Sequence, residues 1–199
     1  HFGVATITLR DALAILRDHG VVDTKRGRNG GSFVLSPREV SDEVLKARLS
    51  TMSSLELRDL CDEHVAISAT AAGLAARRAS NSHHQRLAHF VTALENATTR
   101  NDLRRADARL HMEIAVASES VRLTHGEMRL QSEMGELHWI STSEVHKSTA
   151  IAEHRAILQA VVAGEFNLAT ALTEAHVKQA IKRLMDMRLA LLRLQEGAL

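Results

Sequence analysis

The chain contains a single proline, Pro37, and no proline follows it. Proline breaks a helix because it lacks an N–H donor and clashes with the preceding turn, so the stretch beyond Pro37 is free to form long helices. Alanine, leucine, arginine and glutamate, which favour helix, are abundant there, whereas aromatic residues make up only 3% of the chain. We therefore expect a mostly α-helical protein whose organisation changes near Pro37.

Composition and charge set the outer limits on function. A chain of 199 residues with 45% hydrophobic residues can bury the core of one large or two small domains. Its net charge of +1 leaves nucleic acids and small acids open as partners, because local patches decide such binding. The single cysteine, Cys61, excludes an intrachain disulfide. No apolar run reaches the ~20 residues of a membrane span, and no secretory signal is visible, so we expect a cytoplasmic protein.

The first 35 residues follow a helix-then-hairpin pattern. Residues 5–19 place apolar side chains at helical spacing, and Gly20 suits the left-handed position that ends a helix. A short extended stretch, the basic turn DTKRGRNGG and a second apolar stretch at residues 32–35 follow. Two short strands around a glycine-rich turn predict a β-hairpin.

This segment has the residues of a DNA-reading element. Thr8 and Arg10 lie near the start of the predicted helix, where they can reach base edges or phosphates in a major groove. In the turn, three cations against the one carboxylate of Asp23 leave a net charge of +2 over residues 23–31, and glycines allow close approach to a DNA backbone. A solvated helix and turn in any small domain remains the alternative.

Beyond a polar segment around Pro37, the pattern is helical. Short polar breaks separate helices that we expect at residues 40–50, 53–79, 81–98, 101–117, 119–142, 148–163 and 165–195. Short connections between helices predict an antiparallel bundle. We expect a DNA-binding part at residues 1–36, a linker at 37–45 and an all-α bundle at 46–199. Because the pattern starts abruptly at His1, we expect the DNA-binding part to be the C-terminal half of a larger domain.

A candidate metal site lies in the bundle. Asp107 and His111 are four residues apart, so they project from one face of a helix, and His154 and His176 lie on two later helices. Three imidazoles and a carboxylate suit a divalent metal ion, Zn²⁺ first, with Ni²⁺, Mn²⁺ or Fe²⁺ also compatible. The alternative is that His111 and His154 are simply buried and hydrogen-bonded. Five other histidines lack comparable partners: His83, His84, His89, His125 and His146.

The N-terminal segment resembles the winged helix-turn-helix of GntR-family regulators. The matching residues are Gly3, Val4, Thr8, Leu9, Arg10, Ala12, Leu13, Leu16, Gly20, Val21, Val22, Gly27, Gly30, Gly31, Phe33 and Val34. The resemblance implies that Thr8 and Arg10 contact operator DNA from the recognition helix and that Arg26, Gly27 and Arg28 approach it from the wing. The chain departs from the family at Ala5 and Thr6, where Ser-Arg is usual, which puts the operator sequence in doubt.

Residues 46–185 resemble the FCD ligand-binding domain of the FadR subfamily. Four motifs carry the likeness in the family's order: ELRDLCD, DARLHMEIAVAS, AEHRAILQAVVAGEF and ATALTEAHV. The resemblance implies that Asp107, His111, His154 and His176 bind a divalent ion inside the bundle.

Three further residues are candidates for binding an effector beside that ion. Arg58, in the ELR motif, matches a family position that helps to hold the effector, although a surface salt bridge with Asp62 is the alternative. Trp139 precedes His154 along the chain and can wall a pocket or pack in the core. His64 is a further candidate.

These features together predict a transcription regulator and not an enzyme. A homodimer would bind a palindromic operator, and a small carboxylic acid at the metal would change the spacing of its DNA-binding parts, most simply relieving repression. One alternative is a regulator that senses the metal itself. Another is a metal-dependent hydrolase, since such a site can activate water; it would need a general base, and no further carboxylate or histidine has a compelling spacing.

Overall fold

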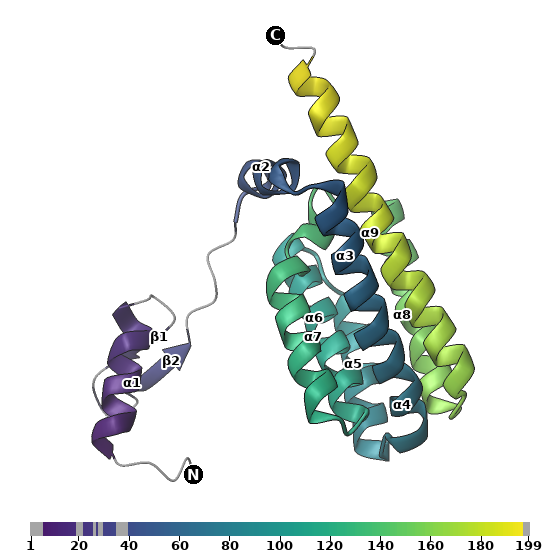
Figure 1. Cartoon of the computed structure of the whole chain (residues 1–199). Coiled ribbons are helices and arrows are strands. Elements are labelled where there is room, and N and C mark those ends of the chain that lie inside the picture. Colours follow the sequence, from purple (N-terminus) through teal and green to yellow (C-terminus); the bar gives the residue numbers. More distant parts are fainter. Residues whose placement is uncertain (1–5, 19–21, 26, 28–29, 35–39, 197–199) are drawn as a thin grey trace. The chain divides into compact units, whose positions relative to one another are not determined.

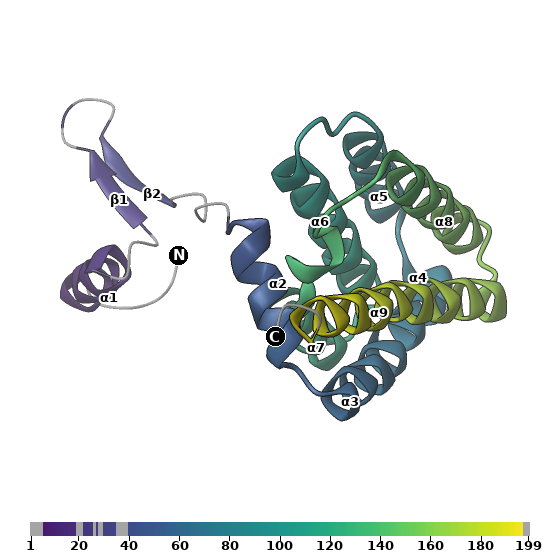
Figure 2. The same ribbon diagram turned by 90° about the horizontal axis from the view of Figure 1, so that it is seen from above.

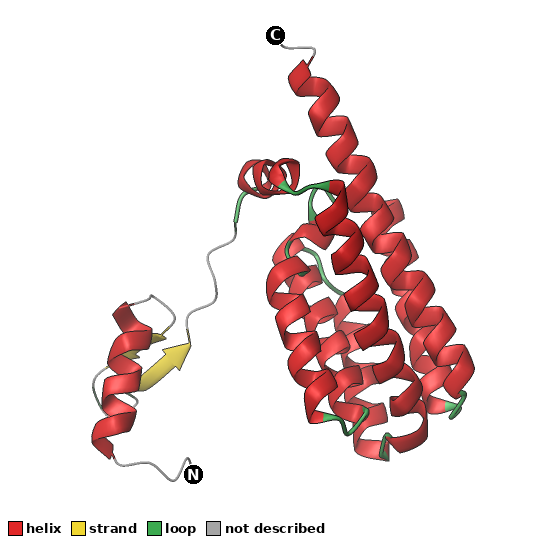
Figure 3. Cartoon of the chain, viewed as in Figure 1, coloured by secondary structure: helices red, strands yellow, loops and turns green. Residues whose placement is uncertain are grey.

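The computed structural model describes residues 6–18, 22–25, 27, 30–34 and 40–196 (Figure 1). The chain divides into two compact units, residues 1–39 and 40–199. Helices account for most of the described residues, and strands occur only in the first unit (Figure 3). The predicted mostly α fold is therefore confirmed.

The first unit is a helix followed by a hairpin, as predicted. It consists of α1 (Thr6–Asp18), β1 (Val22–Lys25) and β2 (Gly31–Val34), with the strands antiparallel and Lys25 opposite Gly31. Gly27 adopts a φ of +116°, a conformation that side chains with a Cβ rarely take, and its carbonyl accepts a hydrogen bond from Gly30 N at 2.8 Å. Gly27 therefore serves the backbone geometry of the basic turn.

The second unit contains helical elements only, within the described residues. Figure 2 shows this bundle from one end. Its elements are α2 (Asp42–Thr51), α3 (Ser54–His64), the π-helix η1 (Val65–Ala69), α4 (Thr70–Arg78), α5 (Asn81–Glu95), α6 (Arg100–Ala117), α7 (Val121–Met134), the 3₁₀ helix η2 (Leu137–Trp139), α8 (Glu144–Val162) and α9 (Phe166–Glu196). None of the helices in the described parts is long and apolar enough to cross a bilayer.

Serine and threonine side chains set where most of these helices begin. Each accepts a hydrogen bond from a backbone N–H in the first turn, which would otherwise lack a partner. The capping residues are Ser41, Ser53, Thr99, Ser120 and Ser143. Ser53 and Glu56 form a reciprocal capping box at the start of α3. The polar breaks in the sequence are therefore helix starts with a defined chemistry.

The structure differs from the sequence-based prediction in several places. The predicted helix 119–142 ends at Met134, and Ser143 then caps α8, which begins four residues before the predicted start. The expected helix 53–79 contains the π-helix η1. Residues 40–45, expected in the linker, belong to the second unit because Arg100 bonds both Asp42 and the Val40 carbonyl.

The long helix α9 packs against α2, α3, α4 and α8 and so connects several helices of the bundle. Its contact with α4 is close at Gly73. A Cβ added there would lie 2.3 Å from Thr170 Oγ1 and 2.8 Å from the ring of Phe166. Only glycine lets the two backbones approach to this separation.

Gly73→Val should therefore destabilise the bundle. Overpacking of a tight contact costs about 1–3 kcal/mol, and valine gains little in helix propensity over glycine. Urea unfolding followed by circular dichroism should show this loss, whereas the exposed Thr70→Ala on the same helix should change stability by less than ~0.5 kcal/mol. Equal stabilities for the two variants would contradict this description of the α4–α9 contact.

Candidate metal centre

The structure brings the four predicted metal ligands together. Asp107 and His111 lie on α6, His154 on α8 and His176 on α9, and all four are buried. His154 Nε2 lies 3.2 Å from His111 Nε2 and 3.2 Å from Asp107 Oδ1. One ligand atom from each of the three histidines lies within 4.8 Å of the others. Helices distant in sequence thus converge on one point.

A second contact orients two of the three rings of this cluster. His154 Nδ1 lies 2.7 Å from the carbonyl of Ala150, and because a carbonyl only accepts, Nδ1 is the protonated donor. His176 Nδ1 lies 2.6 Å from the carboxylate of Glu153. These contacts leave Nε2 of both rings to bind an ion. Histidine ligands in metal sites are held by such acceptors on the opposite nitrogen.

The protonation states also suit a cation. Burial lowers the pKa of His154 to about 4 and holds that of His176 well below its usual value of 6.5. Burial would raise the pKa of Asp107, but His111, His154 and His138, together with a hydrogen bond from Trp139, leave this pKa below its usual value. At neutral pH the cluster therefore contains the buried carboxylate of Asp107 and the neutral imidazoles of His154 and His176. A divalent ion would compensate that buried charge, so the donor set fits one.

Trp139 positions the carboxylate ligand. Its Nε1 donates a hydrogen bond of 3.2 Å to Asp107 Oδ2, and the indole is 2% exposed. It also lines a small cavity beside the cluster. The lining residues are Asp107, His138, Trp139, His146, Ala150, His176, Ala180 and Arg183.

Arg183 and His146 line this cavity, and the sequence analysis did not place either of them there. Arg183 is partly buried and forms no hydrogen bond or ion pair with another described residue. His146 stacks on Trp139 with ring centroids 5.1 Å apart, and it lines the same cavity. Helical spacing could have found both. Arg183 follows His176 by seven residues, and His146 precedes His154 by eight, which places each pair on one helix face.

The predicted effector residues lie in different places. The Arg58 side chain is 65% exposed and lies 3.8 Å from Asp59, which differs from the expected partner Asp62, and it does not line the cavity beside the cluster. His64 is buried behind His111, with the two ring centroids 6.2 Å apart. Trp139 alone of the three touches the cavity. His83 also has a partner that the sequence did not reveal, Glu113 at 2.7 Å.

Of the predicted DNA-contacting residues, only some fall within the described chain. Thr8 and Arg10 lie on α1, and Arg10 is exposed. Gly27 is exposed in the turn of the hairpin. Arg26 and Arg28 lie outside the described residues.

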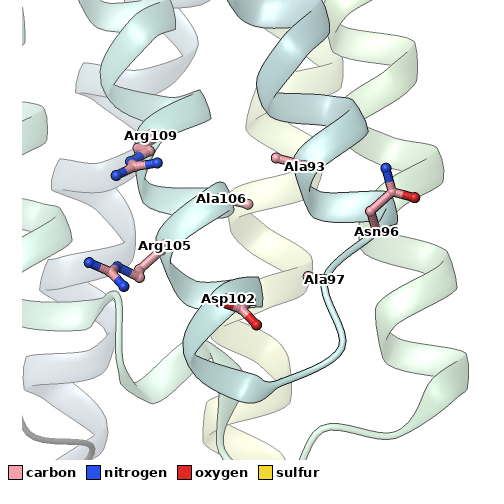
Figure 4. Close-up of a pocket in the computed structure, with 7 residues that line it drawn as sticks. All are labelled: Ala93, Asn96, Ala97, Asp102, Arg105, Ala106 and Arg109. Carbon is pink, nitrogen blue, oxygen red and sulfur yellow. The ribbon is translucent and has the colours of Figure 1, made fainter. Parts of the chain in front are cut away.

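A larger hollow lies elsewhere on the bundle, between α5 and α6. Its volume is about 330 Å³, and none of the four predicted metal ligands lines it. Figure 4 shows Arg105 and Arg109 on α6 and Asn96 at the end of α5. Both arginines are exposed. The chemistry of the buried centre is therefore separate from this surface hollow.

The metal-free protein should lose stability as the pH falls from 6.5 towards 5. Burial lowers the pKa of His64, His138, His154 and His176 in the folded state, so the unfolded chain takes up protons first and is favoured in acid. Burial raises the pKa of Glu153, which favours the folded state as the pH falls, but this one group opposes four histidines. Urea titrations at several pH values in a chelator would measure it.

The exposed His125→Gln variant should show the same pH dependence as the parent chain, because its side chain is in water in both states. A free energy of unfolding that stays constant between pH 7 and 5 would contradict the neutral, buried state assigned to these histidines.

The sequence and structure of the chain were compared with those of known proteins. The FCD domain family matches residues 59–179. Over 193 residues, which span 96% of this chain and 70% of the relative, the chain is 38% identical to a Mycobacterium gastri protein named as the HTH-type transcriptional regulator RmpR. Two solved structures have a similar fold: E. coli McbR/YncC and Streptococcus agalactiae GntR.

McbR/YncC aligns with a TM-score of 0.61 and 14% identity, over 92% of this chain and 86% of its own. The S. agalactiae protein aligns with a TM-score of 0.55 and 19% identity, over 90% of this chain and 82% of its own. At these low identities the two solved structures show a shared fold only. The match to the FCD domain and the 38% identity to the M. gastri protein show family membership. The chain belongs to the GntR family of transcription regulators, in the FadR-like group whose members carry an FCD domain.

Proposed function

We propose that this chain is a regulator whose affinity for operator DNA is controlled by a small carboxylic acid bound at a divalent metal in the second unit. Membership of the family supports the regulator, and the acid and the metal are our inference. The observation that carries it is the buried cluster of Asp107, His111, His154 and His176 with Arg183 beside it.

The four side chains of this cluster would hold the ion. Three imidazole nitrogens and one carboxylate oxygen suit Zn²⁺, and Ni²⁺, Mn²⁺ or Fe²⁺ would also accept them. When bound, the ion would supply an electrophilic partner for one carboxylate oxygen of the effector. Trp139 keeps Asp107 in place through its hydrogen bond, and Ala150 and Glu153 do so for His154 and His176.

Arg183 is the cation suited to the effector's acid group. It lines the same cavity as Asp107 and His176, and its guanidinium can bind a carboxylate through two parallel hydrogen bonds. His138 and His146 offer further polar contacts, and the Trp139 ring forms a wall. An acid bound here would touch η2, α8 and α9 together. Arg58, which we expected in this role, is exposed to solvent.

The first unit supplies the DNA contacts in this proposal. The helix and hairpin correspond to the recognition helix and wing of a winged helix-turn-helix, with Arg10 on the exposed surface of α1. Two copies in a homodimer would bind operator half-sites about one helical turn of DNA apart. The protein would act in the cytoplasm. Effector binding would shift the bundle between two states of different DNA affinity, relieving repression.

Arg183→Gln should weaken the response to the effector. A gel shift of the full-length protein on the DNA upstream of its own gene, repeated across a panel of small carboxylic acids, identifies the active acid. Loss of a charge-assisted hydrogen bond costs about 1.5–3 kcal/mol, so the acid concentration needed for half the effect should rise about tenfold or more.

Arg58→Gln is the matched control, because it removes the same charge from an exposed position and should leave the response unchanged. The opposite ranking would restore Arg58 as the effector residue. A shift that responds to metal alone, and to no acid, would favour a regulator that senses the ion itself.

Asp107→Asn and His154→Asn should each abolish zinc binding at this cluster. Asp107→Asn removes the carboxylate ligand and His154→Asn removes an imidazole ligand, and an ion that binds only the folded state stabilises it. Zinc should therefore raise the melting temperature of the parent chain by more than it raises that of either variant. The exposed His125→Asn should behave like the parent. A zinc-dependent rise in Asp107→Asn equal to that of the parent would remove Asp107 from the ligand set.

A further inference from the structure

A second group of polar side chains lies on the Nδ1 side of His111, whereas Asp107 lies nearer its Nε2. His64 is the last residue of α3, Glu127 lies on α7 and the half-buried His138 lies on η2. His64 and Glu127 are each 1% exposed. One ligand atom from each of His64, His111 and Glu127 lies within 4.8 Å of the others, the same criterion that the first cluster meets.

His64 lacks the hydrogen bonds that a buried imidazole needs. Neither its Nδ1 nor its Nε2 has a partner among the described residues, although both atoms are buried. His138, whose ring stacks on that of His64 at 5.8 Å, has a buried Nε2 that also lacks one. An unsatisfied buried donor or acceptor costs about 1–3 kcal/mol. Several such atoms side by side indicate a missing partner common to them.

Glu127 is held so that its carboxylate faces this group. Ser68 Oγ donates to Oε2 at 2.5 Å, and Gln131 Nε2 donates to Oε1 at 2.9 Å. Oε1 lies 3.9 Å from both His64 Nε2 and His111 Nδ1, which is too far for a hydrogen bond. The two nitrogens thus point towards one carboxylate oxygen without reaching it.

The fold itself delivers these groups. The π-helix η1 follows His64 directly, and Ser68 lies within it, four residues after His64. A π-helix widens the turn by one residue and is common at functional sites. Because Ser68 bonds Glu127 across the bundle, η1 ties the position of His64 to α7.

We propose that His64, Glu127 and Nδ1 of His111 bind a second divalent cation, so that His111 joins two ions through its two ring nitrogens. Ligand atoms around Zn²⁺ lie about 2.0–2.2 Å from the ion, so rotation of the His64 and Glu127 side chains would close the site. His111 would release its remaining ring proton to solvent, and His138 is available as a fourth donor. The proposed regulator needs the first ion only, so this inference goes beyond it.

Zinc stoichiometry tests the second site. The full-length protein, loaded with zinc and dialysed, should contain two ions per chain by mass spectrometry of the metal. Glu127→Gln and His64→Ala should each contain one, with circular dichroism like that of the parent. His125→Ala, which removes an exposed histidine from the same helix as Glu127, should keep two.

Two results would overturn the proposal. One ion in both the parent and Glu127→Gln would mean that His111 binds metal through Nε2 alone. Loss of all zinc in a folded Glu127→Gln would assign Glu127 to orienting His111 for the first ion. Asp107→Asn separates the two sites, because it should remove only the first ion and leave one zinc per chain. If zinc does not bind the first site, Asp107→Asn will contain as much zinc as the parent, and this result is independent of the Glu127→Gln result.

Discussion

The burial of the Asp107 carboxylate is the constraint on which the centre of the bundle depends. An ionised carboxylate away from water is costly unless it is paired and hydrogen-bonded. Here Trp139 donates to one oxygen, and the rings of His111 and His154 lie near the other. Each contact comes from a different element, so α6, η2 and α8 must meet in one arrangement. The contacts that stabilise the buried Asp107 carboxylate thus also fix how these elements pack.

The long helix α9 links that centre to the rest of the unit. It contributes His176 and Arg183 to the cavity, and it packs tightly on α4 through Gly73. If a ligand bound at Arg183 and shifted α9, the helices that α9 contacts, α2, α3 and α4, would therefore also be displaced. Packed interfaces of this kind move between discrete arrangements rather than deforming continuously.

Sequence reasoning predicted the fold class, the family and the residues that converge at the centre, because each has a local signal. Asp107 and His111 share a helix face, and the motif order matches the FCD domain. It could not predict partners brought together by packing alone. Glu127 and His138 lie on elements without a shared motif, and the π-helix after His64 has no sequence period of its own. Arg58 was predicted from a sequence motif, but its side chain is exposed. Arg183 is partly buried, and no sequence motif indicates that burial.

Trp139 has a consequence for how this protein can be studied. It is the chain's only tryptophan, and the chain has no tyrosine. Its indole bonds Asp107 and stacks on His146, so the one strong ultraviolet fluorophore of the molecule lies against the candidate metal centre. Intrinsic emission therefore reports on this centre without a label and without a background from other sites. A change in this emission on adding a metal ion or an acid would give a direct optical signal from the interior of the bundle.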